Sequence, residues 1–373
     1  MYDTAFLALV LLAFVIQLPF FIFLSYIVCA FYVGIGRQLE SFRVSHLSVW
    51  SIVTFLCMIS AATFNHEWGP LFYLFFSPVL YLAADRFSSK SLAHIVFCLR
   101  NLYWAFVVGI AIGIAVHWGE SEPLGAILPW SSTNGLPSYL IVVQVAYSLA
   151  YFLYNNRLPV FSTVATLSVA VFGLGRGSII IGSLVFFLSI LLNLTVVKSL
   201  VDRKVALRLF LLIAPFLFLY VNQNFGAICS EINLLIEGSK FSSGVLDEHR
   251  GVIIDDYLGK IDAWAFLFGA DYSGTSIVLR YGGNPHNSFI RAHSFYGLFG
   301  LVLIFAPILY IACVNKIVVH KVVAIVLISM VLLRAATEPI LFPTTLDFFY
   351  FLYFFLFLRF AKSATRGGGC LWY

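Results

Sequence analysis

Apolar stretches of about 20 residues recur along the whole chain, and this repetition limits the possible fold more than any other feature. Each stretch is long enough to cross the roughly 30 Å hydrocarbon core of a bilayer as a helix. The stretches are continuous rather than alternately apolar and polar, so they predict helices and not barrel strands. Only 10% of the residues are charged, against about 25% in soluble proteins. The sequence therefore predicts an all-α, polytopic integral membrane protein, with residues 1–373 forming a single membrane domain.

The predicted spans begin with an apolar segment over residues 4–36, which forms either one bent span or two spans around Pro19. This segment has no basic amino-terminal region and no A-x-A cleavage site, so we interpret it as retained rather than as a signal peptide. The remaining predicted spans are residues 45–64, 69–84, 91–116, 138–155, 158–173, 177–195, 205–221, 288–313, 321–336 and 344–360. The total is about 11 or 12 transmembrane helices.

The basic residues are concentrated in alternate connections between these spans, which predicts the orientation of the chain. The connections on one side contain Arg37, Arg43, Arg86, Lys90, Arg157, Lys198, Arg203, Lys204, Arg208, Lys316, Lys321, Arg359, Lys362 and Arg366. The opposite short connections contain Arg176 and otherwise mainly glutamates. The positive-inside rule places the basic set in the cytoplasm. The sequence thus predicts a multi-pass protein of the cell inner membrane with one long periplasmic loop, residues 222–288. The formal net charge of +5 then reflects topology and predicts no nucleic-acid partner.

Metal and cofactor motifs are missing from the sequence. The six cysteines are dispersed without metal-ligand spacing, and there is no GxxxxGK[ST] phosphate loop. The adjacent Asp255 and Asp256 point about 100° apart on a helix, so they chelate a metal poorly. We therefore expect no metal site and no cofactor.

The stretch "GLGRGSIII" places Arg176 in a tight turn before a span on the predicted periplasmic side. The flanking Gly175 and Gly177 allow a ligand to approach the backbone closely, and a helix start attracts anions. These features favour an anion site. The alternative is a plain surface turn whose arginine reaches the lipid headgroups.

The stretch "GGNPHNSFIRAHSFYGLFG" puts several polar residues at the start of another span. Asn-Pro fits a helix cap followed by the first helical residue, so Asn284 is the predicted cap and His286 the second helical residue. On a regular helix, His286, His293, Gly297 and Gly300 share one stripe, on which the glycines admit a neighbouring helix. Arg291 points about 140° away from His286 and is not expected to belong to the site. The alternative is that these polar residues mark the water interface.

The long loop contains an apolar pattern at helical spacing over residues 252–268, with Ile253, Tyr257 and Trp264 among the apolar positions. It predicts an amphipathic helix lying on the outer membrane interface. Arg250 stands at its beginning.

These pieces together resemble the O-antigen polymerase/ligase superfamily of bacterial envelope glycosyltransferases, over residues 160–360. "GRGSII" resembles the arginine motif of the family, here Arg176, although the usual leucine is replaced by Ile180. "DEHRGVIIDDYLGKI" followed by "FGAD" resembles the loop arginine and glycine turn, here Arg250 and Gly269. "NPHNSFIRAHSFYGLFGL" resembles the histidine–asparagine motif, with the residues His286, Asn287 and Gly297.

The resemblance implies metal-independent glycan transfer from undecaprenyl diphosphate at the periplasmic face. Arg176 and Arg250 would bind the diphosphate, and His286 would take the proton of the acceptor hydroxyl or, alternatively, bind the diphosphate as a cation. Arg280 and Asn287 would contact the substrate. The implied partners are an undecaprenyl-diphosphate-linked oligosaccharide, membrane lipids and a chain-length regulator.

Two other functions stay open at this point. A ligase of the same family would transfer the glycan to lipid A–core, whereas a polymerase, which we favour, would extend the lipid-linked chain. A lipid-linked oligosaccharide flippase would need ionisable residues near the bilayer midplane. The main charged residues within the spans are Arg100 and Arg334, and Arg334 is expected to pair with Glu338 one turn later.

Overall fold

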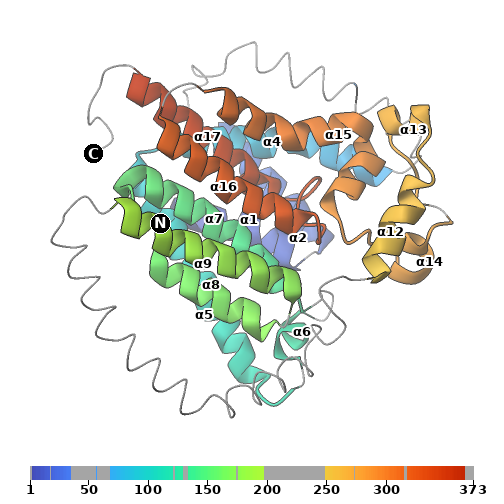
Figure 1. Ribbon diagram of the computed structural model, residues 1–373, viewed down its shortest axis with the longest axis horizontal. Coiled ribbons are helices and arrows are strands. Elements are labelled where there is room, and N and C mark those ends of the chain that lie inside the picture. Colours follow the sequence, from blue (N-terminus) through green and yellow to red (C-terminus); the bar gives the residue numbers. More distant parts are fainter. Residues whose placement is uncertain are drawn as a thin grey trace.

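The computed structural model describes residues 2–16, 18–34, 56, 68–120, 122–128, 133–173, 175–196, 248–272, 274–314 and 317–365. Within these ranges every regular element is a helix (Figure 1). The helices are α1 (Tyr2–Ile16), α2 (Pro19–Gly34), α4 (Trp68–Ser88), α5 (Leu92–Val116), α6 (Pro123–Ile127), α7 (Gly135–Asn155), α8 (Val160–Phe172), α9 (Arg176–Val196), α12 (Glu248–Leu258), α13 (Ala263–Phe268), α14 (Ser276–Tyr281), α15 (Ser288–Cys313), α16 (Val318–Ala335) and α17 (Asp347–Thr365).

Five of the helices in the described residues are long and apolar enough to cross a membrane, namely α5, α7, α9, α15 and α16. Each coincides with a predicted span to within a few residues. The prediction of an all-α membrane protein with several spanning helices is confirmed at this level. The total of 11 or 12 spans stays a prediction, because spans 45–64 and 205–221 lie outside the described residues, apart from residue 56.

The first apolar segment forms two helices rather than one bent span. α1 ends at Ile16 and α2 begins at Pro19. The proline ring disfavours helical geometry at the preceding Leu18, and its missing N–H is not needed at a helix start. Phe6 near the start of α1 stacks on Tyr32 near the end of α2, with ring centroids 4.2 Å apart. The two helices therefore run antiparallel.

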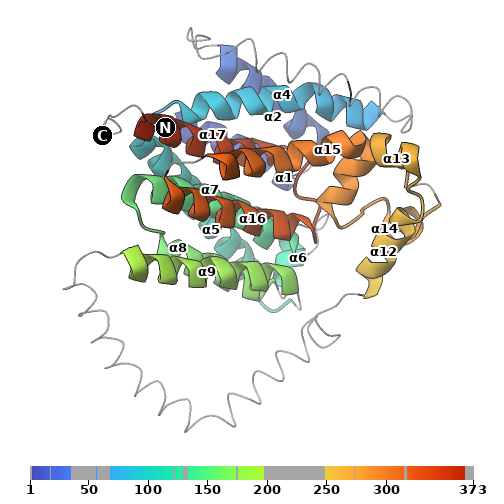
Figure 2. The same ribbon diagram turned by 45° about the horizontal axis from the view of Figure 1, so that its top comes forward.

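The core of the bundle is built around α7. Figure 2 shows α2 and α4 on one side of the bundle and α8 and α9 on the opposite side. α7 packs against α5, α8, α16 and α17, and nearly all of its residues are buried. Halfway along it, Gln144 donates to the hydroxyl oxygens of Ser148 (2.7 Å) and Ser162 (3.1 Å). The Thr166 hydroxyl donates to the Gln144 carbonyl oxygen at 3.4 Å. These bonds satisfy a buried amide and join α7 to α8.

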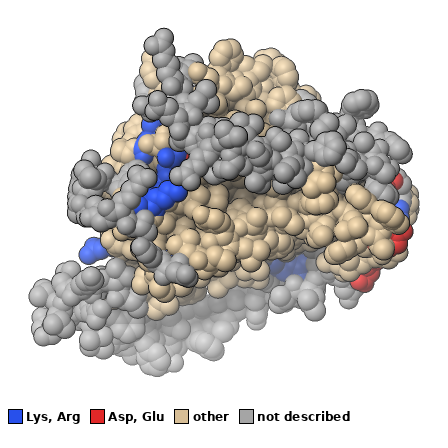
Figure 3. All heavy atoms as spheres, turned by 90° about the horizontal axis from the view of Figure 1, so that it is seen from above, with Lys and Arg blue, Asp and Glu red and all other residues tan. Residues whose placement is uncertain are grey.

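The two ends of the bundle differ in charge. At the first, the end of α17 meets the end of α4, where Arg359 pairs with Asp85, and His320 contacts Asn156 at 2.8 Å. The Lys and Arg side chains visible in Figure 3 gather mainly towards this end, which we call the basic end. The opposite end carries α12, α13 and α14 together with the starts of α9, α15 and α17, and most Asp and Glu side chains visible in Figure 3 lie there. We call it the acidic end.

At the acidic end, the prediction of one amphipathic helix over residues 252–268 is wrong. The segment is two helices, α12 and α13, because the chain turns at Gly259 and Asp262 starts a new helix by accepting the Ala265 N–H at 2.7 Å. Of its predicted apolar residues, Ile253 and Tyr257 are buried against α14 and α15, whereas Trp264 is 65% exposed. The packing of Ile253 and Tyr257 fixes α12 to the bundle, and the placement of this segment on the membrane interface stays a prediction.

Candidate functional site

The turn that precedes α15 differs from its prediction. Asn287, not Asn284, caps the helix, because its side-chain oxygen accepts the N–H groups of Phe289 (2.8 Å) and Ile290 (3.2 Å). The Asn284 side chain instead accepts the N–H of His286 at 2.9 Å, which forms a local turn. His286 therefore lies outside the helix, half-buried, with a φ of 48°. The predicted stripe that begins at His286 is wrong for this reason.

His293 is buried and fixes α12 and α13 to α15. Its Nε2 lies 2.9 Å from the Phe266 carbonyl oxygen, and its Nδ1 lies 2.7 Å from the Tyr257 hydroxyl. A carbonyl only accepts, so Nε2 carries the hydrogen, and in the neutral ring Nδ1 accepts from Tyr257. The alternative that His293 marks the water interface is wrong, because only 4% of the residue is exposed to solvent.

Two glycines named by the resemblance meet at this junction. Gly297 has a φ of 60° and interrupts the helical geometry of α15, and a Cβ there would overlap the Leu267 carbonyl. A Cβ at Gly269, whose φ is 91°, would overlap the carbonyls of His293 and Ser294. Both positions need a residue without a side chain. The glycines thus bring the chain after α13 onto α15, rather than admitting a neighbouring transmembrane helix as the stripe predicted.

Arg176 is the first residue of α9, at the acidic end, and its side chain is half-buried. The glycines beside it are packed against protein. A Cβ at Gly175 would overlap the Asn134 side chain, and one at Gly177 would lie 2.7 Å from Nη1 of Arg334. The space that we expected a ligand to use at Gly175 and Gly177 is therefore filled by these two side chains.

Arg334, in the last turn of α16, forms a buried polar cluster with residues of α7 and of the turn that follows α16. Its Nη2 lies 3.4 Å from Oε1 of Glu338, so the predicted pair is confirmed. Nε donates to the Ser138 hydroxyl at 3.0 Å, and Nη1 donates to the Thr337 hydroxyl at 2.6 Å. Arg334 is 1% exposed, so these partners compensate a charge that burial alone would strongly disfavour.

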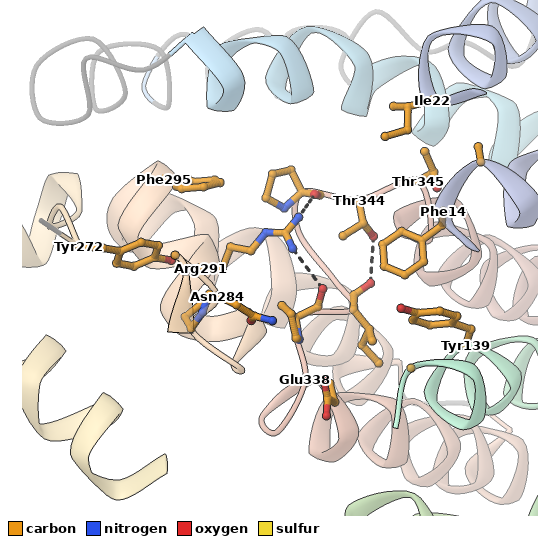
Figure 4. A pocket seen from close by; sticks show the side chains of 18 residues that line it. Phe14, Ile22, Tyr139, Tyr272, Asn284, Arg291, Phe295, Glu338, Thr344 and Thr345 are labelled. Carbon is orange, nitrogen blue, oxygen red and sulfur yellow. Dashed lines mark hydrogen bonds between the residues drawn. The ribbon is translucent and has the colours of Figure 1, made fainter. Parts of the chain in front are cut away.

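A cavity of about 500 Å³ lies at the acidic end beside this cluster. It is enclosed by the end of α1, the start of α2 and α7, the turn before α15, the first turns of α15, and the loop over residues 338–345. Figure 4 shows Arg291 and Asn284 reaching into it from the side of α15, and Phe14 and Tyr139 facing them from α1 and α7. The lining is Ala13, Phe14, Ile22, Gly135, Tyr139, Tyr272, Gly282, Gly283, Asn284, Pro285, Arg291, Phe295, Glu338, Pro339, Ile340, Pro343, Thr344 and Thr345.

The loop over residues 338–345 is held from two sides. Arg291 donates from Nη1 to the Pro339 carbonyl at 3.2 Å and from Nη2 to the Pro343 carbonyl. On the other side, the buried carboxylate of Asp347 accepts the N–H groups of Phe342 (2.9 Å) and Thr344 (3.0 Å). The loop backbone therefore has fixed partners, which gives the cavity wall a defined shape.

The predicted site residues are partly brought together. Arg176, Arg280, His286 and Asn287 all belong to the acidic end, yet none of them is among the described residues that line the cavity. Arg250 lies in the first turn of α12, and its side chain is outside the described residues. Arg280 is exposed on α14.

Arg291 is the lining residue that sequence reasoning rejected. The angle of about 140° between His286 and Arg291 assumed that both lie on one regular helix. It does not apply, because His286 precedes α15 and Arg291 is the fourth residue of α15. The sequence did contain an indication of this role. An arginine within a span needs polar partners, and the connection "EPILFPTTLD" (residues 338–347), predicted to lie on the same side of the membrane, supplies backbone carbonyls.

Ionisation at the acidic end keeps the tyrosines neutral and Asp256 charged. Burial raises the pKa of Tyr257 and of Tyr272, so both hydroxyls keep their proton at neutral pH. Hydrogen bonds from Ser276 hold the pKa of Asp256 below its usual range, and the nearby charge of Arg280 acts in the same direction. Among the described residues, no group of three His, Cys, Asp or Glu side chains is placed to hold a metal ion.

The comparisons with known proteins give no match. No protein-family model matches the chain. No curated protein matches it either, and no solved structure does.

Proposed function

We propose that this chain is a metal-independent membrane glycosyltransferase, an O-antigen polymerase that acts at the periplasmic face of the cell inner membrane. It transfers a growing glycan from undecaprenyl diphosphate onto the non-reducing sugar of another lipid-linked repeat unit. The observation that carries the proposal is the cavity at the acidic end, because its walls combine hydroxyl, amide, guanidinium and aromatic groups. The motif residues Arg176, Arg280 and His286 belong to the same end.

The chemistry requires a stabilised leaving group and an activated hydroxyl. As the glycosidic bond breaks, its electron pair stays on the diphosphate, and guanidinium groups such as Arg176 and Arg250 donate to the developing charge. The acceptor oxygen forms the new bond to the anomeric carbon, and its proton passes to His286. The half-buried position of His286 outside the helix, at a turn beside the cavity, suits contact with a substrate there. In the alternative role, a protonated His286 would bind the diphosphate itself.

A flippase is less well supported than an enzyme. Transport of a polar headgroup across the membrane requires ionisable groups near the midplane. Arg334 lies instead in the last turn of α16, at the acidic end, and is paired with Glu338. Arg100 is exposed and stacks over Phe97 with 5.5 Å between the guanidinium carbon and the ring centroid. Neither residue offers its charge to a transport path.

The proposal is tested by the surface polysaccharide of a host that makes the lipid-linked repeat and lacks its own polymerase. Arg176→Ala, Arg250→Ala and His286→Ala should each remove the ladder of long chains while one repeat unit remains attached to lipid A–core. Loss of one preorganised donor typically slows a reaction by about 10²–10³-fold. Arg157→Ala at the basic end is the matched control and should leave the ladder intact.

Different glycan patterns separate the alternatives. Free lipid-linked polymer together with bare core would identify a ligase. Full ladders from all three alanine variants, at membrane levels equal to the wild type, would exclude the proposed site. Accumulation of the repeat unit on the cytoplasmic side would point to a flippase.

A further inference from the structure

We propose that the cavity at the acidic end binds neutral sugar units of the glycan, and not the diphosphate that carries them. The inference rests on the proposed function only for the identity of the ligand as a glycan. It is carried by residues that the family resemblance does not name.

Several hydrogen-bonding groups of the cavity wall have no partner among the described residues. Thr345 is 2% exposed and lines the cavity, yet its hydroxyl makes no hydrogen bond. A buried hydroxyl without a partner is uncommon and indicates a missing ligand or water. Arg291 uses two of its five N–H groups on carbonyls. The Asn284 amide nitrogen points towards the cavity in Figure 4. These groups form a set of donors that suits a ligand rich in hydroxyl and ether oxygens.

Aromatic side chains complete the wall. Phe14 and Tyr139 lie on one side of the cavity, and Phe295 and Tyr272 lie on the side of α15 (Figure 4). A pyranose ring presents a face of C–H groups that packs on an aromatic ring, while its edge of hydroxyl groups forms hydrogen bonds. A volume of about 500 Å³ falls in the range of small-molecule sites.

The charges of the cavity favour a neutral ligand over a diphosphate. The positive charge of Arg334 is matched by Glu338 at 3.4 Å, and the Glu338 side chain also lines the cavity. A carboxylate in the wall repels an anion. Arg291 is the one lining cation of the described residues, and two carbonyls already accept from it. The half-buried Arg176 and the exposed Arg280 lie outside the lining and are better placed to meet a doubly charged group.

The test measures binding to the purified full-length protein in lipid nanodiscs. The first probe is the oligosaccharide repeat of the expression host, released from its lipid by mild acid. The second probe is geranyl diphosphate, which carries the diphosphate and a short prenyl chain without sugar. Dissociation constants for both are measured for the wild type, Thr345→Val and Phe14→Ala. Thr163→Val is the matched control, because the buried hydroxyl of Thr163 in α8 contacts the Val160 carbonyl at 2.7 Å and the Ser189 hydroxyl at 3.0 Å, and Thr163 does not line the cavity.

The oligosaccharide should bind the wild type and the Thr163→Val control equally. Thr345→Val should weaken its binding about three- to tenfold, since one hydrogen bond is lost, and Phe14→Ala about tenfold or more through the lost ring contact. Geranyl diphosphate should bind all four proteins equally and should not displace the oligosaccharide.

Three results would overturn the inference. In the first, the oligosaccharide binds all variants equally. In the second, geranyl diphosphate displaces the oligosaccharide and its own affinity falls in Thr345→Val. In the third, the wild type binds no oligosaccharide. Each of these results counts against the sugar site whatever polysaccharide ladder the cells produce. The proposed function fails separately, when the Arg176, Arg250 and His286 variants still build full-length chains.

Discussion

Replacement of His293 by leucine should release α12 and α13 from α15 while the transmembrane bundle stays folded. The side chain joins three segments through two hydrogen bonds, one to the Tyr257 hydroxyl and one to the Phe266 carbonyl. Leucine retains most of the volume and forms neither bond. The buried Tyr257 hydroxyl would lose its partner at 2.7 Å, at a cost of about 1–3 kcal/mol. Water can reach the more exposed Phe266 segment, so the second loss is about 0.5–1.5 kcal/mol. The sum is about 1.5–4.5 kcal/mol.

Hydrogen–deuterium exchange of the protein in nanodiscs measures this loss directly. A change of 1.4 kcal/mol is tenfold in an opening equilibrium, so amides of α12 and α13 should exchange from about tenfold to more than a thousandfold faster. Amides of α7 should be unaffected. His117→Leu is the matched control, since His117 contacts Glu120 at the surface, and it should change exchange little.

A double-mutant cycle measures the coupling between His293 and Tyr257. Tyr257→Phe removes the other partner of the same bond, so the double variant should lose less than the sum of the two single variants. Strict additivity, or unchanged exchange in His293→Leu, would mean that His293 does not hold α12 and α13 in place.

Three further predictions concern packing and topology. Gly175→Ala should lower the thermal unfolding temperature in detergent, because its Cβ overlaps a buried amide side chain; an unchanged temperature would contradict the close packing. Arg334→Met should lower the free energy of unfolding by about 3–5 kcal/mol, because the buried Glu338 loses its ion-pair partner. In chemical unfolding, the double variant with Glu338→Gln should recover part of this loss. In a cysteine-free background, a membrane-impermeant maleimide added to spheroplasts should label Asp271→Cys but not Lys362→Cys, and the reverse pattern would invert the proposed orientation.

The helices of this fold were largely predictable because their causes are local. A run of apolar residues that must satisfy its own backbone in lipid forms a helix whatever its neighbours are. The break between α1 and α2 occurs at Pro19, because the proline ring disfavours continuation of the preceding helix. For these features the sequence contains both the cause and the position.

The candidate site was only partly predictable because its geometry depends on distant partners. Nothing near His293 in the sequence indicates that Tyr257 will face it. The cap is Asn287 rather than the predicted Asn284 because both residues can cap a helix, and only Pro285 and His286 lie between them. Because the helix begins three residues later than predicted, His286 lies outside it and the predicted position of Arg291 around the helix does not apply. Arg291 lines the cavity. A helix start misplaced by three residues was enough to change which side chains belong to the site.

The amide cluster around Gln144 has a consequence for how the protein is made. Its hydrogen-bonding partners lie within α7 itself and in α8, the next helix to be synthesised. When α7 enters the bilayer during synthesis, only α8 must follow before the Gln144 amide has all of these hydrogen-bonding partners. Arg334 emerges much later, when Ser138 is already in place to receive it. For Gln144 and Arg334, at least one hydrogen-bonding partner is thus present by the time the next helix has been synthesised.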